Sequence, residues 1–465
     1  MTNNPITFET CPEPNTYTDV APITLTDQTI EARKNKVLQK MQEEKIDVLI
    51  IYADKEHGSN FEYLTGFIPR FEEGLLVIDK SGKSTVVLGN ENLKLANLSR
   101  IKVDLIHSPL FSLPNQPMEN DDKLENIFSH LKLQNQQRIG LIGWKMFTTS
   151  VQPAEQMLDI PYFIVDALKN ATKDDVELVN GAYLLIGDHG ARTTNNANEI
   201  AHYEYGANLA STRMLKALNA IEIGAKETDI GQHLNAEGQY NSVVTIAATG
   251  KRFEKANIYP SYKQVKRGDP MSLTVGYKGG LSSRAGLVVE NEQQLPEDQT
   301  DYLEAVAKPY YHAVVTWLET IKVGIKGDQL YQAIERVFPK EKYHWHLNPG
   351  HLVADEEWMA SPIYNHSSEP LKSGMIFQID IIPSVPGYTG VSAEECVALA
   401  DQTLQANIKK QYPELWERIL SRKAYLQDIL NIEVSPDVLP LSNTVAYLRP
   451  FYLAKDKALK VKRAR

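Results

Sequence analysis

In the first third of the chain, apolar residues form short runs separated by polar stretches and one helix-spaced stripe. The run KIDVLIIYA (45–53) is almost continuously apolar, which is typical of a strand inside a sheet. The segment GLLVIDKSGKSTVVLG (74–89) predicts a hairpin, because two apolar runs flank a polar turn that contains glycine. We predict further strands at 102–106, 138–142 and 162–165, and helices at 27–44 and 123–131. This alternation predicts an α/β domain.

The rest of the chain changes to longer helical stripes that alternate with apolar strands. Helical spacing predicts helices over 174–189 and 196–223 and an amphipathic helix from about residue 409 to 430. The segment GMIFQIDIIP (374–383) predicts a buried strand, because its apolar residues leave no face for solvent. This part of the chain is long enough for a second domain with its own core.

These patterns divide the chain into four parts, joined by a linker at 166–180. The predicted parts are an N-terminal arm (1–28), an α/β domain (29–166), a second domain (174–445) and a C-terminal tail (446–465).

Composition and charge exclude several classes of protein. The net charge of −10 gives no basic surface for nucleic acid or an anionic membrane. The two cysteines, Cys11 and Cys396, lie too far apart in sequence to suggest a disulfide framework or a zinc cluster. No apolar run approaches 18 residues and no signal peptide is evident, so we expect a cytoplasmic protein without a membrane span.

The strongest chemical signal lies between His344 and Glu395. Asp380 sits inside an apolar strand, where a carboxylate must be paired, hydrogen-bonded or liganded. His351 follows a glycine, and Glu394 and Glu395 precede another apolar run. Strand alternation points only one of these two glutamates inward, and the register between them stays open.

These motifs carry a resemblance to a known family. The pair Gly350-His351, the Gly-Met-apolar strand that ends in Asp380 and the Gly-Val-x-x-Glu strand that contains Glu394 resemble the pita-bread family. That family includes creatinase, prolidase and Xaa-Pro aminopeptidase (peptidase M24-like). The segments EIAHYEYGANLAS (199–211) and NFEYLTGFIPRFEEGLLVI (60–78) extend the resemblance to most of the chain.

The resemblance implies an α+β fold of two domains. A small α/β domain of the creatinase type would precede a curved antiparallel sheet covered by helices. It also implies a homodimer. In the metallopeptidases of this family, two aspartates, one histidine and two glutamates hold two divalent ions, and His351, Asp380 and Glu394 match the last three positions.

The other positions depart from the family pattern. Thr274 stands at the first aspartate position, and the second falls on Leu281 or Ala285. Asn257 and Trp358 replace two further histidines. These losses resemble creatinase, so we expect no metal cofactor. If a metal is bound, we expect Mn, Co or Zn on His351, Asp380 and Glu394.

Three functions compete. The leading hypothesis is a creatinase-like, metal-independent hydrolase of a C–N bond in a small amide or guanidino substrate, in which His351, Asp380 and Glu394 are catalytic. The alternatives are an Xaa-Pro aminopeptidase or dipeptidase with an atypical metal site, acting on short peptides, and a binding protein without activity. The expected substrate-binding residues are Asn257, Thr274, Arg284, Trp358, Phe71 and Arg70.

Two simpler interpretations remain open for residues in this region. Asp380 could be only a structural partner of Arg284, the single cation of its predicted strand. Asp355, Glu356 and Glu357 are interpreted as a solvated charge run.

Overall fold

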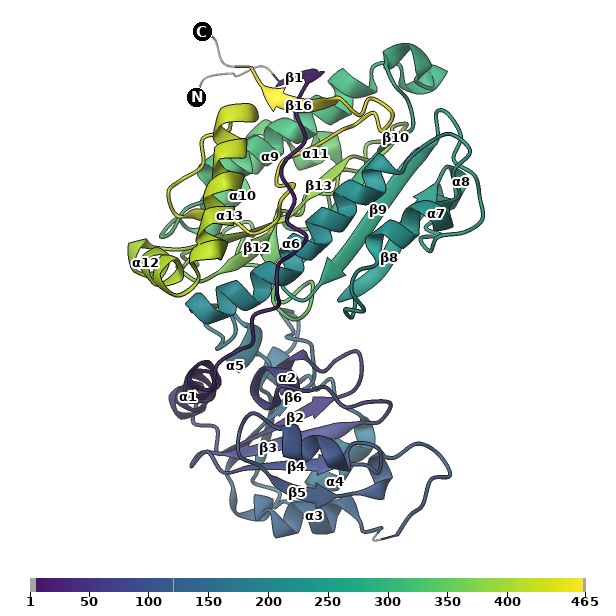
Figure 1. The fold of residues 1–465 in the computed structure, drawn as a ribbon. Helices are drawn as coiled ribbons and strands as arrows, with labels where there is room; N and C mark the ends of the chain where they lie inside the picture. The colour runs from purple at the N-terminus through teal and green to yellow at the C-terminus, as the bar shows by residue number, and fades with distance from the viewer. Residues whose placement is uncertain (1–5, 120, 463–465) are drawn as a thin grey trace. The chain divides into compact units, whose positions relative to one another are not determined.

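The computed structural model describes residues 6–119 and 121–462. By Cα proximity the chain divides into two compact units: residues 25–193, and residues 1–24 together with 194–465. The predicted two-domain α+β fold is confirmed (Figure 1).

The N-terminal unit contains a six-stranded sheet in the order β5-β4-β3-β2-β6-β7. Its strands are β2 Val48–Ala53, β3 Gly74–Asp79, β4 Ser84–Leu88, β5 Asp104–His107, β6 Arg138–Ile142 and β7 Glu177–Asn180. Its helices are α1 Asp27–Glu43, α2 Ser59–Thr65, α3 Leu124–His130, α4 Tyr162–Ala171 and α5 Tyr183–Ile186.

Two predictions near the end of this unit are wrong. Residues 162–165 begin helix α4 instead of forming a strand, and the helix buries Ile164, Val165 and Leu168. The apolar run is too short to distinguish the period of a helix from that of a strand. Residues 177–180, which we predicted within the linker and within a helix over 174–189, form β7, which pairs in parallel with β6.

The C-terminal unit contains two four-stranded antiparallel sheets, β13-β10-β9-β8 and β11-β12-β14-β15. The strands of the first sheet are β8 Val243–Thr249, β9 Pro270–Tyr277, β10 Gly280–Leu287 and β13 Ser392–Glu394. Those of the second are β11 His351–Leu352, β12 Ile376–Gln378, β14 Cys396–Leu399 and β15 Val438–Pro440. The helices are α6 Ala197–Asn219, α7 Glu227–Gly231, α8 Lys251–Glu254, α9 Lys308–Thr320, α10 Gly327–Val337, α11 Lys340–Tyr343, α12 Gln402–Gln411 and α13 Pro413–Ala424.

The two sheets meet at a joint where one chain segment passes from the first to the second. Strands β13 and β14 are separated only by Glu395, whose carbonyl accepts the N–H of Ile379 at 2.9 Å. Across the joint, the buried amide of Gln378 bonds both the carbonyl and the N–H of Leu281. Residues at the ends of β12 and β13 are therefore held close together.

Helix α6 packs on β9 and β10 and is tied to α13 by buried charges (Figure 1). The carboxylate of Glu204 accepts hydrogen bonds from Arg418 at 2.9 and 2.7 Å and from Arg422 at 2.7 Å. Burial alone would raise the pKa of Glu204, but the guanidinium groups of Arg422 and Arg418 outweigh it and hold this pKa below its usual range.

We expect Glu204→Gln to lower the free energy of unfolding near pH 7 by about 3 kcal/mol, because two buried guanidinium groups lose their counter-ion. A lowered folded-state pKa stabilises the fold above the unfolded value of about 4.3, and this contribution is lost as the pH falls through the folded value. The difference from wild type should therefore shrink below about pH 4. Urea unfolding at several pH values measures it, with the exposed Glu414→Gln as control, and a pH-independent difference would contradict the prediction.

The ends of the described chain form a two-stranded ribbon of their own. Strand β1 Ile6–Thr10 pairs antiparallel with β16 Lys457–Val461, so that Phe8 lies opposite Leu459. The predicted N-terminal arm and C-terminal tail are thus joined within the C-terminal unit.

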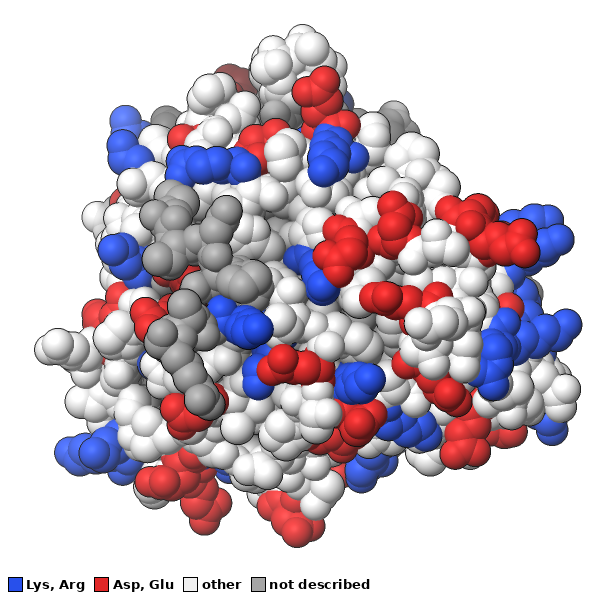
Figure 2. All heavy atoms as spheres, turned by 90° about the horizontal axis from the view of Figure 1, so that it is seen from above, with Lys and Arg blue, Asp and Glu red and all other residues white. Residues whose placement is uncertain are grey.

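The surface agrees with the charge balance of the sequence. On the face in Figure 2, Lys and Arg side chains are interspersed with Asp and Glu. Among the described residues, no helix has the length and apolar character needed to cross a membrane.

Candidate functional site

The candidate site lies at the joint between the two sheets of the C-terminal unit. His351 begins β11, Asp380 lies two residues beyond β12, and Glu394 ends β13. Gly350 precedes the histidine with a φ of 111°, a conformation that favours glycine, and a Cβ there would lie 3.0 Å from the carbonyl oxygen of Gln378. The indole of Trp317 fixes the same turn by donating to the carbonyl of Pro349 at 2.7 Å.

The structure brings His351, Asp380 and Glu394 together. Each offers one ligand atom, and these atoms lie within 4.8 Å of one another. The Nε2 atom of His351 is 3.9 Å from Oδ2 of Asp380 and 4.0 Å from Oε1 of Glu394. All three residues are buried. Their catalytic role stays a prediction.

The imidazole of His351 is oriented to offer Nε2 to this group. Its Nδ1 lies 3.2 Å from the carbonyl oxygen of Leu352, which fits a protonated Nδ1 and leaves the lone pair on Nε2. Among the described residues, neither Nε2 of His351 nor Oδ1 of Asp380 has a hydrogen-bond partner of good geometry. Buried polar atoms without partners are rare, and here two of them belong to neighbouring residues of the site.

The protonation equilibria show how crowded the charges are. Burial raises the pKa of Asp380 to about 6, although nearby His351 opposes the rise. Burial and the neighbouring Asp380 also raise the pKa of Glu394 well above its usual range. Burial lowers the pKa of His351, but Glu357 and Asp380 outweigh burial and raise it overall. A cation at this point would relieve the repulsion between the carboxylates.

Glu357 belongs to this group, and sequence reasoning missed it. Its Oε1 lies 3.1 Å from Nε2 of His351, and its side chain is 27 % exposed. We had predicted that Glu357 belongs to a solvated charge run, and for this residue that prediction is wrong. The available signal was its place beside Trp358, the position at which the family pattern carries a second histidine.

Trp358 lies against the site, where we predicted a substrate-binding residue. Its indole stacks on the imidazole of His351, with ring centroids 4.1 Å apart and an interplanar angle of 23°. The side chain is also 38 % exposed, so it offers an apolar surface beside the buried carboxylates.

A row of three residues crosses neighbouring strands at the site. In the register of β9, β10 and β13, Thr274 pairs with Ser283, and Ser283 pairs with Glu394. The two hydroxyl oxygens lie 2.9 Å apart. Ser283, and not Leu281 or Ala285, therefore faces the first of the two expected aspartate positions.

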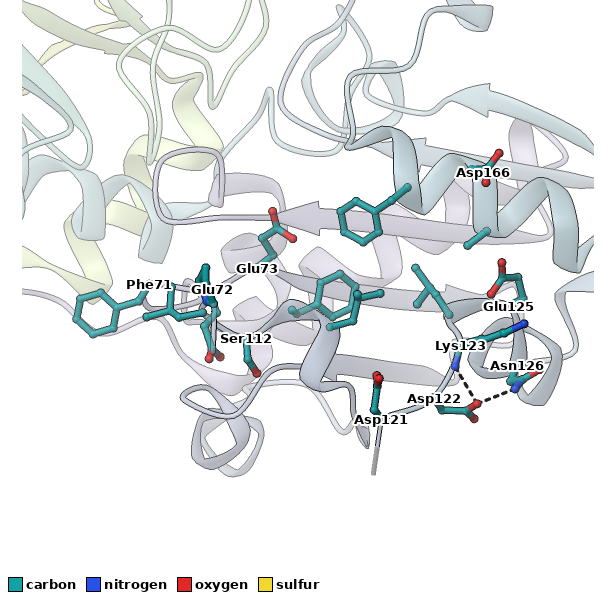
Figure 3. A pocket seen from close by; sticks show the side chains of 17 residues that line it. Phe71, Glu72, Glu73, Ser112, Asp121, Asp122, Lys123, Glu125, Asn126 and Asp166 are labelled. Carbon is teal, nitrogen blue, oxygen red and sulfur yellow. Dashed lines mark hydrogen bonds between the residues drawn. The ribbon is translucent and has the colours of Figure 1, made fainter. Parts of the chain in front are cut away.

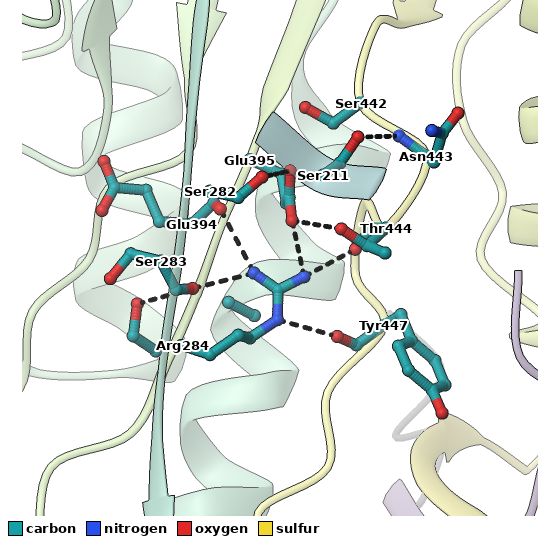
Figure 4. A network of polar contacts seen from close by, with 12 residues as sticks. Ser211, Ser282, Ser283, Arg284, Glu394, Glu395, Ser442, Asn443, Thr444 and Tyr447 are labelled. Atoms are coloured by element: carbon teal, nitrogen blue, oxygen red, sulfur yellow. Dashed lines mark hydrogen bonds and ion pairs between the residues drawn. The ribbon is translucent and has the colours of Figure 1, made fainter. Parts of the chain in front are cut away.

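Arg284 has a structural role instead of the predicted substrate-binding one (Figure 4). Its guanidinium is fully buried and pairs with Glu395 at 2.7 Å. It also donates to the carbonyl oxygens of Ser283, Glu394, Thr444 and Tyr447. Glu395 thus points away from His351, and the partner of Arg284 is not Asp380. Of the two glutamates, Glu394 is therefore the one that lies at the site.

The remaining predicted residues are not brought to His351 by any described contact. Asn257 is exposed in the turn after α8. Phe71 is 62 % exposed and, with the guanidinium of Arg70 lying 5.2 Å from its ring centroid, belongs to the N-terminal unit. There Phe71 lines a cleft of about 950 Å³ whose walls also carry Glu72, Glu73 and Asp166 (Figure 3).

Comparisons with known proteins identify the family. The profile of metallopeptidase family M24 matches residues 202–401, which include His351, Asp380 and Glu394. The profile of the creatinase/prolidase N-terminal domain matches residues 33–180. Residues 202–401 belong to metallopeptidase family M24. The predicted resemblance is confirmed, and so is the expectation of a hydrolase at the level of this family.

Solved structures of the family share the fold at low sequence identity. The chain is similar to an Xaa-Pro dipeptidase from Bacillus anthracis, with 17 % identity, a TM-score of 0.60 and coverage of 80 % of this chain and 96 % of that one. It is also similar to the prolidase from Pyrococcus furiosus, with 20 % identity, a TM-score of 0.57 and coverage of 78 % and 96 %. No curated protein sequence matches the chain.

These findings correct one prediction and change which functional hypothesis is favoured. The expected absence of a metal cofactor is wrong, because the chain matches a metallopeptidase family and contains a buried histidine and carboxylate group suited to a metal ion. Family M24 and its peptidase structures favour the peptidase alternative over the creatinase-like hypothesis.

Proposed function

We propose that this chain is a metal-dependent hydrolase of short peptides, of the Xaa-Pro dipeptidase or aminopeptidase class. The observation that supports it most is the buried group of His351, Asp380 and Glu394, whose ligand atoms lie within 4.8 Å of one another. Imidazole and carboxylate donors suit Mn, Co and Zn, the ions of the original alternative. The chemistry that such an ion supplies when bound is Lewis-acid polarisation of a substrate carbonyl.

The residues around this group have separate tasks in the proposal. The carbonyl of Leu352 holds the imidazole of His351 in the tautomer that presents Nε2. The exposed face of Trp358 offers an apolar wall for a small or cyclic side chain of the substrate. Asp380 and Glu394 are buried, so bulk water has little access to their carboxylates.

The proposal is tested by metal binding and peptide hydrolysis together. After chelation, the purified chain is dialysed against Mn, Co or Zn, desalted and analysed for metal content. Hydrolysis of Xaa-Pro dipeptides and longer Xaa-Pro peptides is then compared with matched Xaa-Ala peptides. We expect retained metal and metal-dependent cleavage that prefers proline.

Two results would contradict the proposal. If the chain retains no metal, the proposed metal-dependent hydrolysis is wrong. If it retains metal but cleaves no peptide, the alternative of a binding protein is favoured. The expected cytoplasmic location and homodimer are proposals as well. Sedimentation equilibrium of the full chain tests the second of these directly.

A further inference from the structure

The cleft of about 950 Å³ in the N-terminal unit is built from packed elements of that unit (Figure 3). Its walls come from the turn before β3, the loop after β5, the start of α3 and helix α4. Phe111 and Leu124 in these walls belong to the hydrophobic core of the unit, which holds the walls in place. Small-molecule pockets measure about 300–1,000 Å³, so this cleft has room for a ligand at the upper end of that range.

Large apolar side chains line the cleft and remain open to solvent. Four of them are between 38 % and 62 % exposed: Phe71, Leu110, Leu113 and Phe163. Phe71 also has a φ of 63°, which aromatic residues rarely adopt and which is typical of binding sites. Exposed apolar side chains that gather in one hollow mark an interaction site. A small, strongly hydrated cation would leave these side chains uncovered.

The same walls carry an excess of negative charge. Six acidic residues line the cleft together with Lys123, and within residues 6–119 and 121–462 none of the six forms an ion pair with lysine or arginine: Glu72, Glu73, Asp121, Asp122, Glu125 and Asp166. Burial raises the pKa of Glu73 above its usual range, a hydrogen bond from Tyr52 opposes the rise, and repulsion from Asp54 adds to it. The cleft therefore favours a positively charged ligand.

Glu72 adds a buried acceptor to the lining. Its side chain is only 3 % exposed. The Oε2 atom accepts the N–H of Glu91 at 3.0 Å and the amide of Asn92 at 3.1 Å. The Oε1 atom has no hydrogen-bond partner among the described residues. Buried carboxylate oxygens without partners are rare, and a donor from a ligand in the cleft would satisfy this one.

We propose that this cleft binds a peptide segment of a partner protein in which basic residues alternate with large apolar ones. The apolar side chains of the segment cover the exposed rings and leucines of the walls, and its cations pair with the free carboxylates. Figure 3 shows Phe71 and Glu72 at one end of the cleft and Asp121 and Glu125 at the other, so an extended segment reaches both groups. This binding site is independent of the proposed peptide hydrolysis.

Fluorescence anisotropy of the full chain with three labelled peptides tests the proposal. Each peptide has twelve residues and blocked ends, and the repeats are Lys-Leu-Gly, Lys-Ser-Gly and Glu-Leu-Gly. We expect the Lys-Leu-Gly peptide to bind at least about 10-fold more tightly than either of the others, because it alone offers both cations and apolar side chains. Its affinity should also fall as salt is raised.

Two variants locate the binding in the cleft. Phe71→Ser and Asp121→Lys should each weaken binding of the Lys-Leu-Gly peptide by about 5-fold or more, because they remove an exposed apolar contact and reverse one charge. The matched controls are Leu98→Ser and Asp174→Lys. Both control positions are exposed residues of the same unit that do not line the cleft, and their variants should stay within about 2-fold of wild type.

Three outcomes would overturn the proposal. Wild type could bind none of the peptides or bind all three equally, or both cleft variants could bind as wild type does. Displacement of the peptide by an equimolar amount of spermine would instead assign the cleft to a small polyamine. The comparison of peptides uses wild type alone and does not depend on whether any variant folds.

Discussion

His351→Ala is expected to abolish metal-dependent peptide hydrolysis and to weaken Zn²⁺ affinity by more than about 100-fold, since even residues behind the ligands cost about 10–100-fold. The reason is geometric, because Nε2 of His351 is the point on which Asp380, Glu394 and Glu357 converge. Calorimetry and the rate of Xaa-Pro dipeptide cleavage provide the two measurements.

A matched control separates loss of the ligand from general damage. His312 is a histidine of the same unit that lies on helix α9 and is not among the residues whose ligand atoms gather at the site. His312→Ala should keep the affinity and the rate within about 3-fold of wild type, because it contributes no donor to the site. If His351→Ala kept both properties as well, the site would have to be sought elsewhere.

Arg284→Ala is expected to lower the free energy of unfolding by about 3–5 kcal/mol, because it leaves the fully buried carboxylate of Glu395 without its charge partner. The loss extends further, since four backbone carbonyl oxygens also lose donors. Chemical denaturation followed by tryptophan fluorescence measures the change.

Arg267→Ala is the control for this prediction. Arg267 precedes the hairpin of β9 and β10, and its pair with Glu290 is long, at 4.0 Å, and half exposed. Such a pair contributes about 0–1 kcal/mol. An equal loss of unfolding free energy in both variants would show that the buried pair of Arg284 and Glu395 stabilises the fold no more than an exposed pair does.

The architecture was predictable from sequence because long helical stripes and apolar runs bounded by glycine can be recognised without knowing which strands pair. The run that contains Asp380 was interpreted as a buried strand, and its part 376–378 forms β12. The helix that begins at Tyr162 was missed, because four apolar or aromatic residues satisfy both the strand and the helix period.

The site was predictable only where a residue carries its own signal. An aspartate within an apolar run, such as Asp380, is conspicuous in any sequence. Glu357 lies in a run of three consecutive acids, and only the fold of its loop places it 3.1 Å from His351. Ser283 lies opposite Thr274 because of the register between β9 and β10. The alternation of side chains along each strand does not determine that register.

The choice between Glu394 and Glu395 shows the same limit. Both precede the same apolar run, and strand alternation alone gives no reason to prefer either. The joint between the sheets decides, because the strand pairing of β13 directs Glu394 to His351 while Glu395 meets Arg284 on the other face. Tertiary partners, not local pattern, assign the two roles.

The ribbon of β1 and β16 has a consequence for synthesis of the chain on the ribosome. Residues 6–10 are made before their partners at 457–461, and an entire unit of residues 25–193 is made between them. That unit is continuous and can fold during translation, whereas the C-terminal unit cannot close its ribbon until residues 457–461 have left the ribosome. Folding of the C-terminal unit therefore waits for its most distant pairing, which also limits its rate.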